Sequence, residues 1–247
     1  MNIEIFDTGE NMGQHAAMQG AIYIREALKR NESISIIVAT GASQFSMLNS
    51  LVIEKDIDWS KVEVFHLDEY VGISADHKAS FRRYLKERFE QKVGCVKAFH
   101  YIEGDAEDLN KEVERISSLI REKEIAVAFI GIGENGHIAF NDPPADLTTD
   151  DPYLVVDLDT PCRAQQVGEG WFSSIEEVPS QAISMSIRQI LKSKVIICSV
   201  PDERKADAVH MALNSPVIPR YPCASLREHK NCYLFTDRMS AGKILRK

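Results

Sequence analysis

Cysteine is scarce in this sequence, and the cysteines that occur are not placed as pairs. Five are spread over 247 residues without any C-x-x-C pair. A disulfide scaffold needs an even set in a small secreted chain, and a structural zinc site needs closely spaced ligands. The spacing therefore predicts neither disulfides nor a metal site, and it fits a reducing cytosol. The five are Cys95, Cys162, Cys198, Cys223 and Cys232.

Long apolar runs and an excess of positive charge are also lacking. No stretch approaches the roughly 18 apolar residues of a membrane span, and MNIEIFDTGE is no signal peptide. The net charge of −8 argues against a nucleic-acid partner, although a locally basic pocket can still bind a phosphate. We therefore expect a cytoplasmic protein with no membrane or nucleic-acid partner. Without repeats or linkers, residues 1–247 are predicted to form one domain.

Apolar runs of strand length alternate with helical segments along the chain. Such alternation predicts an α/β fold with a doubly wound, mostly parallel, Rossmann-like sheet. The expected strands are Ile3–Phe6, Ile34–Ala39, Val62–Leu67, Ile125–Ile130, Val195–Val200 and Cys232–Phe235. The expected helices are Asn11–Arg30, Gln44–Glu54, Ser80–Lys92, Asp105–Lys123, Arg188–Lys192, Pro201–Leu213 and Cys223–His229, with a frayed tail over Met239–Lys247.

Residues 144–180 interrupt this alternation. Prolines are frequent in and just before this region, and its stretch Cys162–Phe172 (CRAQQVGEGWF) mixes a cation, amides and aromatic residues. We interpret the region as an excursion from the core, and next to a functional loop such an excursion is a candidate lid.

The most informative stretch is Gly131–Pro143, which reads GIGENGHIAFNDP and follows a buried-type strand. Its glycines, Gly136 among them, permit a sharp turn and a close approach of the backbone to a ligand. The turn carries a histidine, His137, with Asn135 and Asp142 near it in sequence. A titratable group on a loop after a strand is a candidate for a functional site.

Polar groups follow the other strands as well. Thr40, Gly41, Ala42 and Ser43 form a turn between a strand and a helix, which suits an anion such as a sugar phosphate, although Ser43 as an ordinary N-cap explains it equally well. Asp68 and Glu69 follow the next strand, where Asp68 as a turn cap and Glu69 as a solvated side chain are the alternative. Arg204 and Lys205 stand near a helix start and suggest a bound anion, or are solvated surface cations.

These strand ends are expected to meet, because ligands of open α/β sheets bind outside the carboxyl ends of the strands. Two motifs at these strand ends resemble those of a known family. LDEYVG and GHIAFNDP resemble motifs of the glucosamine-6-phosphate deaminases, a sugar-phosphate isomerase family whose fold group includes 6-phosphogluconolactonases, and the likeness runs from about Ile34 to Phe235.

The resemblance implies a reaction and roles. The substrate is an amino sugar phosphate, glucosamine 6-phosphate or its galacto epimer, converted to a ketose 6-phosphate and ammonia without cofactor or metal. The phosphate is held by the loop matching Thr40–Ser43 and by Lys205, with Glu69 and Gly136 as further binding candidates. Asp68 is implied to move a proton between C2 and C1, and His137 to open the sugar ring. We expect Asp68 to be partly buried, since burial would make it a stronger base.

Three departures from the family pattern concern this function. Family members often have an aspartate where this chain has Asn135 and a glutamate where it has Asp142, so that steering of the histidine would depend on Asp142. The phosphate-binding arginine near the end of the lid segment is replaced by Glu169-Gly170-Trp171, for which Arg163 or Arg204 are candidate substitutes. The chain also ends without the extended tail of allosterically regulated members, which puts such regulation in doubt.

Two other classes of function are weighed against the deaminase. A 6-phosphogluconolactonase would use the histidine to activate water, but these enzymes usually carry a GHTASLFP-like run in place of GHIAFNDP. A sugar-phosphate sensor would need a DNA-binding helix-turn-helix, for which a single α/β domain leaves no room. The C4 configuration of the sugar and assembly into a homo-oligomer stay open.

Overall fold

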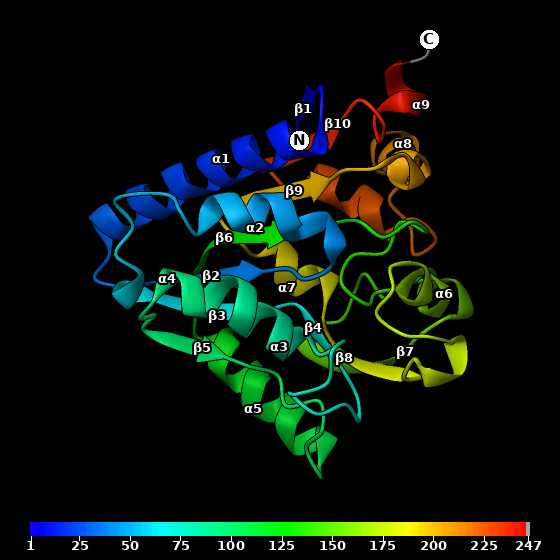
Figure 1. Cartoon of the computed structure of the whole chain (residues 1–247), viewed down its shortest axis with the longest axis horizontal. Coiled ribbons are helices and arrows are strands. Elements are labelled where there is room, and N and C mark those ends of the chain that lie inside the picture. Colours follow the sequence, from blue (N-terminus) through cyan, green and yellow to red (C-terminus); the bar gives the residue numbers. More distant parts are fainter. Residues whose placement is uncertain (246–247) are drawn as a thin grey trace.

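The core of the molecule is a seven-stranded sheet in which every neighbouring pair of strands is parallel (Figure 1). The computed structural model describes residues 1–245. The strand order is β1-β10-β9-β6-β2-β3-β5. In that order the strands are β1 (Asn2–Phe6), β10 (Cys232–Asp237), β9 (Ile196–Val200), β6 (Ile125–Ile130), β2 (Ile34–Val38), β3 (Val62–His66) and β5 (Ala98–His100). All six predicted strands are confirmed, whereas the short β5 was not predicted.

Both faces of this sheet are covered by helices. In β2, Ile36 and Val38 contribute to one apolar cluster and Ile37 to another, so all five residues of the strand are buried. The first cluster includes residues of α1 (Gly9–Arg30), α2 (Phe45–Leu51) and α3 (Phe81–Leu85), which a π-helical turn, Lys86–Glu90, joins to α4 (Gln91–Val93). The second includes residues of α5 (Leu109–Arg121), α7 (Ile187–Leu191) and α8 (Ala206–Asn214).

The position of the site follows from the order of the strands. From β2 the chain proceeds to β3 and β5 on one side, and from β6 it proceeds to β9 and β10 on the other. The winding reverses between the neighbours β2 and β6, so the loops that follow these two strands flank the crevice where such sheets bind ligands.

A second sheet, which the sequence did not indicate, lies beyond the carboxyl end of β3. It is antiparallel, with the order β4-β8-β7 over Asp68–Tyr70, Gln181–Met185 and Tyr153–Asp157. An aromatic cluster that includes Tyr70, Phe81, Phe140 and Phe172 packs with it. Since β4 has only three residues and pairs with a strand more than a hundred positions away, no local pattern predicts it.

The candidate lid region contains regular structure. Besides β7 the region includes α6 (Thr160–Gly168). Tyr153 of β7 is buried in the second apolar cluster, and its hydroxyl donates to the carbonyl of His66 at 2.8 Å. The expectation that this region lies outside the core is therefore wrong for β7. That the part around α6 moves as a lid stays a prediction.

The chain end is also more ordered than predicted. Ser240 and Ala241 are fully buried, and a short helix, α9 (Gly242–Leu245), follows them. The carboxylate of Asp237 accepts a hydrogen bond from the backbone N–H of Ser240 at 2.7 Å, which ties this segment to the end of β10. The predicted frayed tail is thus wrong up to Leu245, and residues 246–247 lie outside the described part. Within residues 1–245, the structure contains no helix that is both long enough and apolar enough to cross a membrane.

Candidate active site

The polar ends of four strands meet in one cleft at the switch point between β2 and β6. The cleft and the open solvent space at its mouth together measure about 550 Å³. The cleft brings together six of the predicted residues from different parts of the chain, namely Thr40, Gly41, Ser43, Asp68, His137 and Lys205. The remaining lining residues are Ala39, Leu67, Phe81, Gly131, Ile132, Gly133, Ala139, Phe140, Gln165, Gln166 and Glu169.

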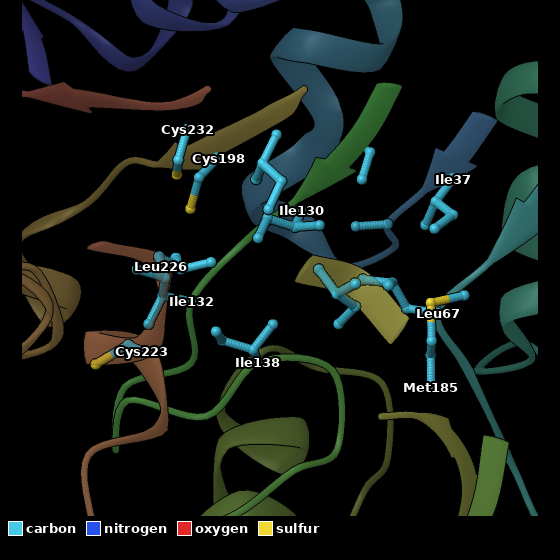
Figure 2. Packing of buried hydrophobic residues seen from close by; sticks show 14 of the residues in the cluster. Ile37, Leu67, Ile130, Ile132, Ile138, Met185, Cys198, Cys223, Leu226 and Cys232 are labelled. Atoms are coloured by element: carbon cyan, nitrogen blue, oxygen red, sulfur yellow. The ribbon is translucent and has the colours of Figure 1, made fainter. Parts of the chain in front are cut away.

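The loop after β6 is anchored in the core at both ends of its glycine turn. Ile132 and Ile138 are buried in the second apolar cluster, which also includes Cys223 and Leu226 (Figure 2). Between them, Gly136 has a φ of +89°, and a Cβ there would lie 3.1 Å from the sulfur of Cys223. Gly136 therefore shapes the turn that presents His137, but it does not line the cleft.

His137 is held between the backbone and a carboxylate. Its ring lies against Gly133, where a Cβ would come within 2.2 Å of Nε2, so a residue larger than glycine does not fit at position 133. Nδ1 lies 3.0 Å from Oδ1 of Asp142. The imidazole is only slightly exposed and borders the cleft.

Asp142 contacts the ring of His137 directly, whereas Asn135 contacts it only through Asp142. That Asp142 steers the histidine stays a prediction. The amide of Asn135 donates to Oδ1 of Asp142 at 3.1 Å, and its oxygen accepts from the backbone N–H of His137. Burial alone would raise the pKa of Asp142, but its contacts with His137 and Asn135 outweigh it and lower that pKa. Asp142 therefore stays ionised beside the ring, behind the cleft wall rather than in it.

Asp68 is a buried carboxyl group that faces the cleft. It is 6% exposed, and its Oδ1 has no hydrogen-bond partner among the described residues. Burial raises its pKa to about 8, the neighbouring charge of Glu69 adds to the rise, and a hydrogen bond with the Thr40 side chain opposes it. Burial of Asp68 was predicted, and the raised pKa gives it the basicity that an isolated aspartate lacks.

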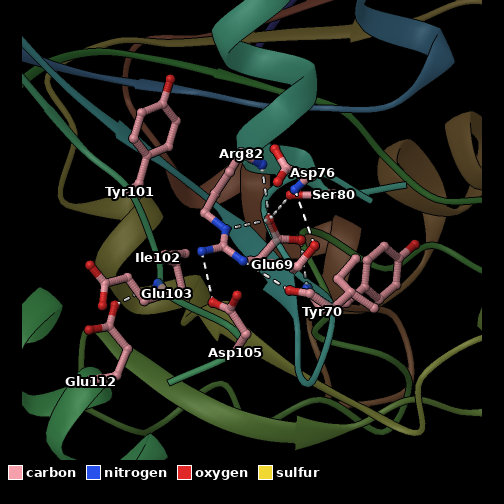
Figure 3. Close-up of polar contacts among 12 residues, drawn as sticks. Glu69, Tyr70, Asp76, Ser80, Arg82, Tyr101, Ile102, Glu103, Asp105 and Glu112 are labelled. Atoms are coloured by element: carbon pink, nitrogen blue, oxygen red, sulfur yellow. Dashed lines mark hydrogen bonds and ion pairs between the residues drawn. The ribbon is translucent and has the colours of Figure 1, made fainter. Parts of the chain in front are cut away.

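Glu69, predicted to bind substrate, does not line the cleft. Its side chain points toward Ser80 and Arg82 instead (Figure 3). Its carboxylate is fully buried and accepts hydrogen bonds from the Ser80 hydroxyl and from backbone N–H groups, including that of Arg82. The Arg82 guanidinium adds an ion pair at 3.4 Å. The side chain alternates to the opposite face of β4 from Asp68, because successive residues of a strand face opposite sides. Glu69 thus anchors α3 to the second sheet, and a role as direct substrate ligand does not fit this geometry.

The loop Thr40–Ser43 contributes three of its four residues to the cleft wall, the exception being Ala42. Gly41 has a φ of +93°, which a glycine adopts without strain. The Tyr84 hydroxyl donates to the Gly41 carbonyl at 2.9 Å, and the amide of Gln44 donates to the Ser43 hydroxyl at 3.2 Å. These bonds hold the loop in position.

Of the three predicted cations, only Lys205 borders the cleft. It is 4% exposed, makes no ion pair within 4.0 Å in residues 1–245, and burial lowers its pKa. Arg204 lies outside and is paired with Asp202 at 2.9 Å. Arg163 donates to the carbonyls of Ile175 and Val178, inside the candidate lid. Neither arginine is therefore placed to replace the missing family arginine.

The candidate lid supplies cleft residues that the sequence did not identify as such. Gln165, Gln166 and Glu169 all come from α6 and its C-cap. The Tyr70 hydroxyl donates to Oε1 of Gln166 at 2.7 Å, and the Gln165 side chain accepts from the backbone N–H of Glu134. The mixture of amides in CRAQQVGEGWF was the one available signal, since amides near an active loop can orient sugar hydroxyls. Nothing local indicated Phe81 or Phe140.

Comparisons with known proteins identify the family of this chain. Residues 7–235 match the family model described as "Glucosamine-6-phosphate isomerases/6-phosphogluconolactonase". A glucosamine-6-phosphate deaminase of Staphylococcus epidermidis is 33% identical over 236 residues, covering 93% of this chain and 96% of the relative. A glucosamine-6-phosphate deaminase of Streptococcus pneumoniae is 33% identical over 224 residues, covering 89% and 93%.

Solved structures show the same fold. A monomeric glucosamine-6-phosphate deaminase superimposes with a TM-score of 0.88 at 28% identity, covering 98% of this chain and all of the other. A putative 6-phosphogluconolactonase from Neisseria gonorrhoeae superimposes with a TM-score of 0.75 at 18% identity, covering 96% and 99%. The second likeness concerns the fold alone.

Proposed function

Because the chain belongs to the family of glucosamine-6-phosphate isomerases and 6-phosphogluconolactonases, we propose that it converts an amino sugar phosphate to a ketose phosphate and ammonia. The substrate class is glucosamine 6-phosphate or its galacto epimer. One observation carries the proposal: Asp68 and His137 line the same cleft as Lys205 and the loop Thr40–Ser43. An acid–base pair therefore faces the space beside a candidate phosphate site.

The phosphate end of the cleft is formed by Lys205 and the loop Thr40–Ser43. A buried ammonium group without an ionic partner is costly, and an anionic ligand removes that cost. The loop adds the hydroxyls of Thr40 and Ser43 and the backbone around Gly41, which has no Cβ to keep a ligand at a distance. Together these groups supply charge and hydrogen bonds for one phosphate.

Asp68 is proposed to carry out the isomerisation. A base must remove the proton from the carbon that bears the amino group and return it to the neighbouring carbon, and one carboxylate can do both. The unpaired Oδ1 of Asp68 is available for this transfer. Its raised pKa brings the basicity of the carboxylate near to neutral pH, where transfer in both directions is easiest.

His137 is proposed to open the sugar ring before the proton transfer. This step takes a proton from the anomeric hydroxyl and delivers one to the ring oxygen, which an imidazole can do near neutrality. Asp142, held by Asn135, lies 3.0 Å from Nδ1 and fixes the orientation of the ring. The amide at position 135 thus retains a positioning function although it carries no charge.

The assay that tests the proposal uses purified protein with glucosamine 6-phosphate and galactosamine 6-phosphate in parallel. Release of ammonia and ketose phosphate in equal amounts from one epimer is expected. Absence of both products with both sugars contradicts the proposal. Hydrolysis of 6-phosphogluconolactone, measured in the same series, would assign the lactonase reaction instead.

A binding experiment separates an enzyme from a sugar-phosphate sensor. The variant Asp68→Asn keeps the shape of the cleft but cannot accept the proton. An enzyme of the proposed kind binds the amino sugar phosphate in this variant and loses isomerisation. A sensor without catalysis shows the same ligand response in both proteins and no turnover in either.

Localisation and assembly are further parts of the proposal. All five cysteines are free thiols, and four are buried, which supports a reducing cytoplasm as the place of action. For self-association, the edge strand β1 exposes Ile3 and Ile5 at 44% and 40%, a surface on which a second copy can pack. Light scattering during gel filtration gives the mass of the particle and decides between monomer and oligomer.

A further inference from the structure

The thiol of Cys162 lies beside the pair formed by His137 and Asp142. One donor atom of each residue, a ring nitrogen, a carboxylate oxygen and the sulfur, lies within 4.8 Å of the other two. Cys162 is 1% and His137 7% exposed. The cysteine belongs to the first turn of α6, whereas the other two residues come from the loop after β6.

The position of Cys162 is fixed by the start of α6. Oδ1 of Asp159 accepts a hydrogen bond from the backbone N–H of Cys162 at 2.6 Å. The backbone N–H of Asp159 in turn donates to Oδ2 of Asp142 at 3.4 Å. The carboxylate of Asp142 therefore contacts both His137 and the start of α6, where the thiol of Cys162 lies. The three donors thus form one connected unit.

A second observation points to a ligand at this position. Nδ1 of His137 is buried and lacks a properly angled hydrogen bond, although Oδ1 of Asp142 lies 3.0 Å away. The ion pair with Asp142 offsets part of the cost of burying this nitrogen, but no well-aligned hydrogen bond completes it. A cation between the nitrogen, the oxygen and the sulfur would satisfy it.

We propose that His137, Asp142 and Cys162 bind a divalent transition metal of the zinc type. Imidazole nitrogen, carboxylate oxygen and thiolate sulfur are the ligands of zinc, whereas magnesium and calcium prefer oxygen alone. On binding, the thiol releases its proton to solvent and a sulfur–metal bond forms, so that thiolate and carboxylate together balance the charge of the ion. A fourth position is left for water.

The geometry requires only a small adjustment. Metal–ligand bonds of about 2.0–2.3 Å place the donors of a tetrahedral zinc site roughly 3.3–3.8 Å apart. Side-chain rotations that open the nitrogen–oxygen pair from 3.0 Å to about 3.3 Å and bring the sulfur about 1 Å closer are sufficient, since no two donors lie more than 4.8 Å apart. The cysteine spacing in the sequence gives no indication of this site, because the fold alone brings residues 137, 142 and 162 together.

The metal inhibits the enzyme, because it occupies the imidazole and its carboxylate partner. This consequence rests on the proposed function, whereas metal binding itself does not. Cys162 does not line the cleft, so a Cys162→Ser variant is expected to keep its metal-free activity. In that variant zinc at a concentration that inhibits the wild type has no effect on turnover.

Cobalt absorption spectroscopy tests the binding directly. Co²⁺ titrated into chelator-treated protein is expected to produce a thiolate-to-cobalt charge-transfer band and the visible bands of a tetrahedral site, and Zn²⁺ is expected to displace them. Cys95→Ser, which removes the exposed cysteine, is the matched control and keeps the bands. Cys162→Ser loses the charge-transfer band and binds Co²⁺ at least about 100-fold more weakly, since even outer partners of metal ligands contribute 10- to 100-fold.

Two outcomes overturn the proposal: no charge-transfer band in the wild type, or a band that persists in Cys162→Ser. If this variant fails to fold, X-ray absorption of the zinc-loaded Cys95→Ser protein replaces it. One sulfur at about 2.3 Å from the metal is then expected, and a sulfur-free site contradicts the proposal. Spectra that support the site without any deaminase activity would reject the proposed function and keep the metal site.

Discussion

The imidazole ring of His137 lies so close to Gly133 that a Cβ at position 133 would be 2.2 Å from its Nε2. The glycine is needed here for space, since its φ is not positive. The backbone of the loop therefore contacts the ring of His137 on one side, and the carboxylate of Asp142 contacts its Nδ1. Ring placement depends on the loop backbone as much as on a polar partner.

Gly133→Ala should consequently displace the ring and lower kcat/KM by about 100-fold or more, because a misplacement of about 1 Å has effects of that size. Gly168→Ala is the matched control, since a Cβ at position 168 meets nothing within 4 Å. Steady-state kinetics with the active epimer, together with thermal unfolding, check both variants. Equal activity of the two would show that the glycine does not position the histidine.

The raised pKa of Asp68 predicts the pH dependence of activity. As the free enzyme is titrated, the base becomes ionised near pH 8, so kcat/KM should rise through an apparent pKa near 8. A profile recorded from pH 6.5 to 9.5 at constant ionic strength checks this. A flat profile in this range would mean that Asp68 is already ionised at pH 6.5 or that another step limits the rate.

The same pKa predicts a cost in stability. Because the folded pKa of about 8 exceeds the ordinary 3.8, the folded protein holds the extra proton between these values. The contribution to stability is complete below pH 3.8 and is lost as the pH rises through 8. Asp68→Asn has no carboxyl group at this position and so does not lose this stability as the pH rises. The free energy of unfolding of the variant minus that of the wild type should therefore be larger at pH 8 than at pH 5 by at least about 1 kcal/mol.

Urea unfolding at the two pH values measures this difference. The exposed Asp76, changed to Asn, serves as control and should show no comparable trend. A stability difference between Asp68→Asn and the wild type that does not grow with pH would mean that the carboxyl is solvated in the free protein.

Lys205 and Arg204 are neighbours in sequence but should differ in function. Lys205→Gln removes the buried cation of the cleft and should raise KM about 10- to 100-fold, the range for hydrogen bonds to a charged group. Arg204→Gln, which alters a half-exposed side chain paired with Asp202, should change KM less than about twofold. Competitive inhibition by inorganic phosphate gives an independent measure of binding at the same site. A larger change of KM in Arg204→Gln than in Lys205→Gln would place the phosphate elsewhere.

Glu169 lines the cleft together with Lys205, at the position where the resemblance implies a phosphate-binding arginine. Its carboxylate, held by Gln165 and Trp171, opposes a bound phosphate. Glu169→Gln should therefore lower KM about two- to fivefold at low salt, and Glu169→Arg should lower it further. This decrease of KM should become smaller at high salt, because salt screens the repulsion between the carboxylate and the phosphate.

Glu176→Gln provides the control for this series, since Glu176 is an exposed acid of the same region outside the cleft. An increase of KM in Glu169→Gln, with Glu176→Gln unchanged, would show instead that the carboxylate binds a substrate hydroxyl or the amino group.

Most of the main sheet could be predicted from local patterns, whereas the second sheet could not. Ile125–Ile130 and Ile34–Val38 are apolar runs of strand length because both faces of a parallel sheet are buried. Asp68–Tyr70 is a strand only because Gln181–Met185 lies beside it. Its pairing depends on the closure of a loop of more than a hundred residues, which no short window of sequence records.

The candidate site divides in the same way. His137, Asp68 and Lys205 could be named because each is a polar group that follows a strand, where a connecting segment alone does not need one. The roles of Glu69, Arg163 and Arg204 could not be read in this way. Whether a side chain at a strand end faces the cleft or the opposite side depends on the packing of α3 and of the candidate lid.

By itself the sequence determined which segments are strands and which chemical groups stand at their ends, since periodicity and residue type are local properties. The tertiary structure alone decided which of these groups share a space. It placed Asp68 and His137 in one cleft, set Glu169 in the same cleft as Lys205, and brought Cys162 to the carboxylate of Asp142. Such distances depend on strand order and on how α6 packs over the cleft, and both are set by the burial of apolar surface in the whole chain.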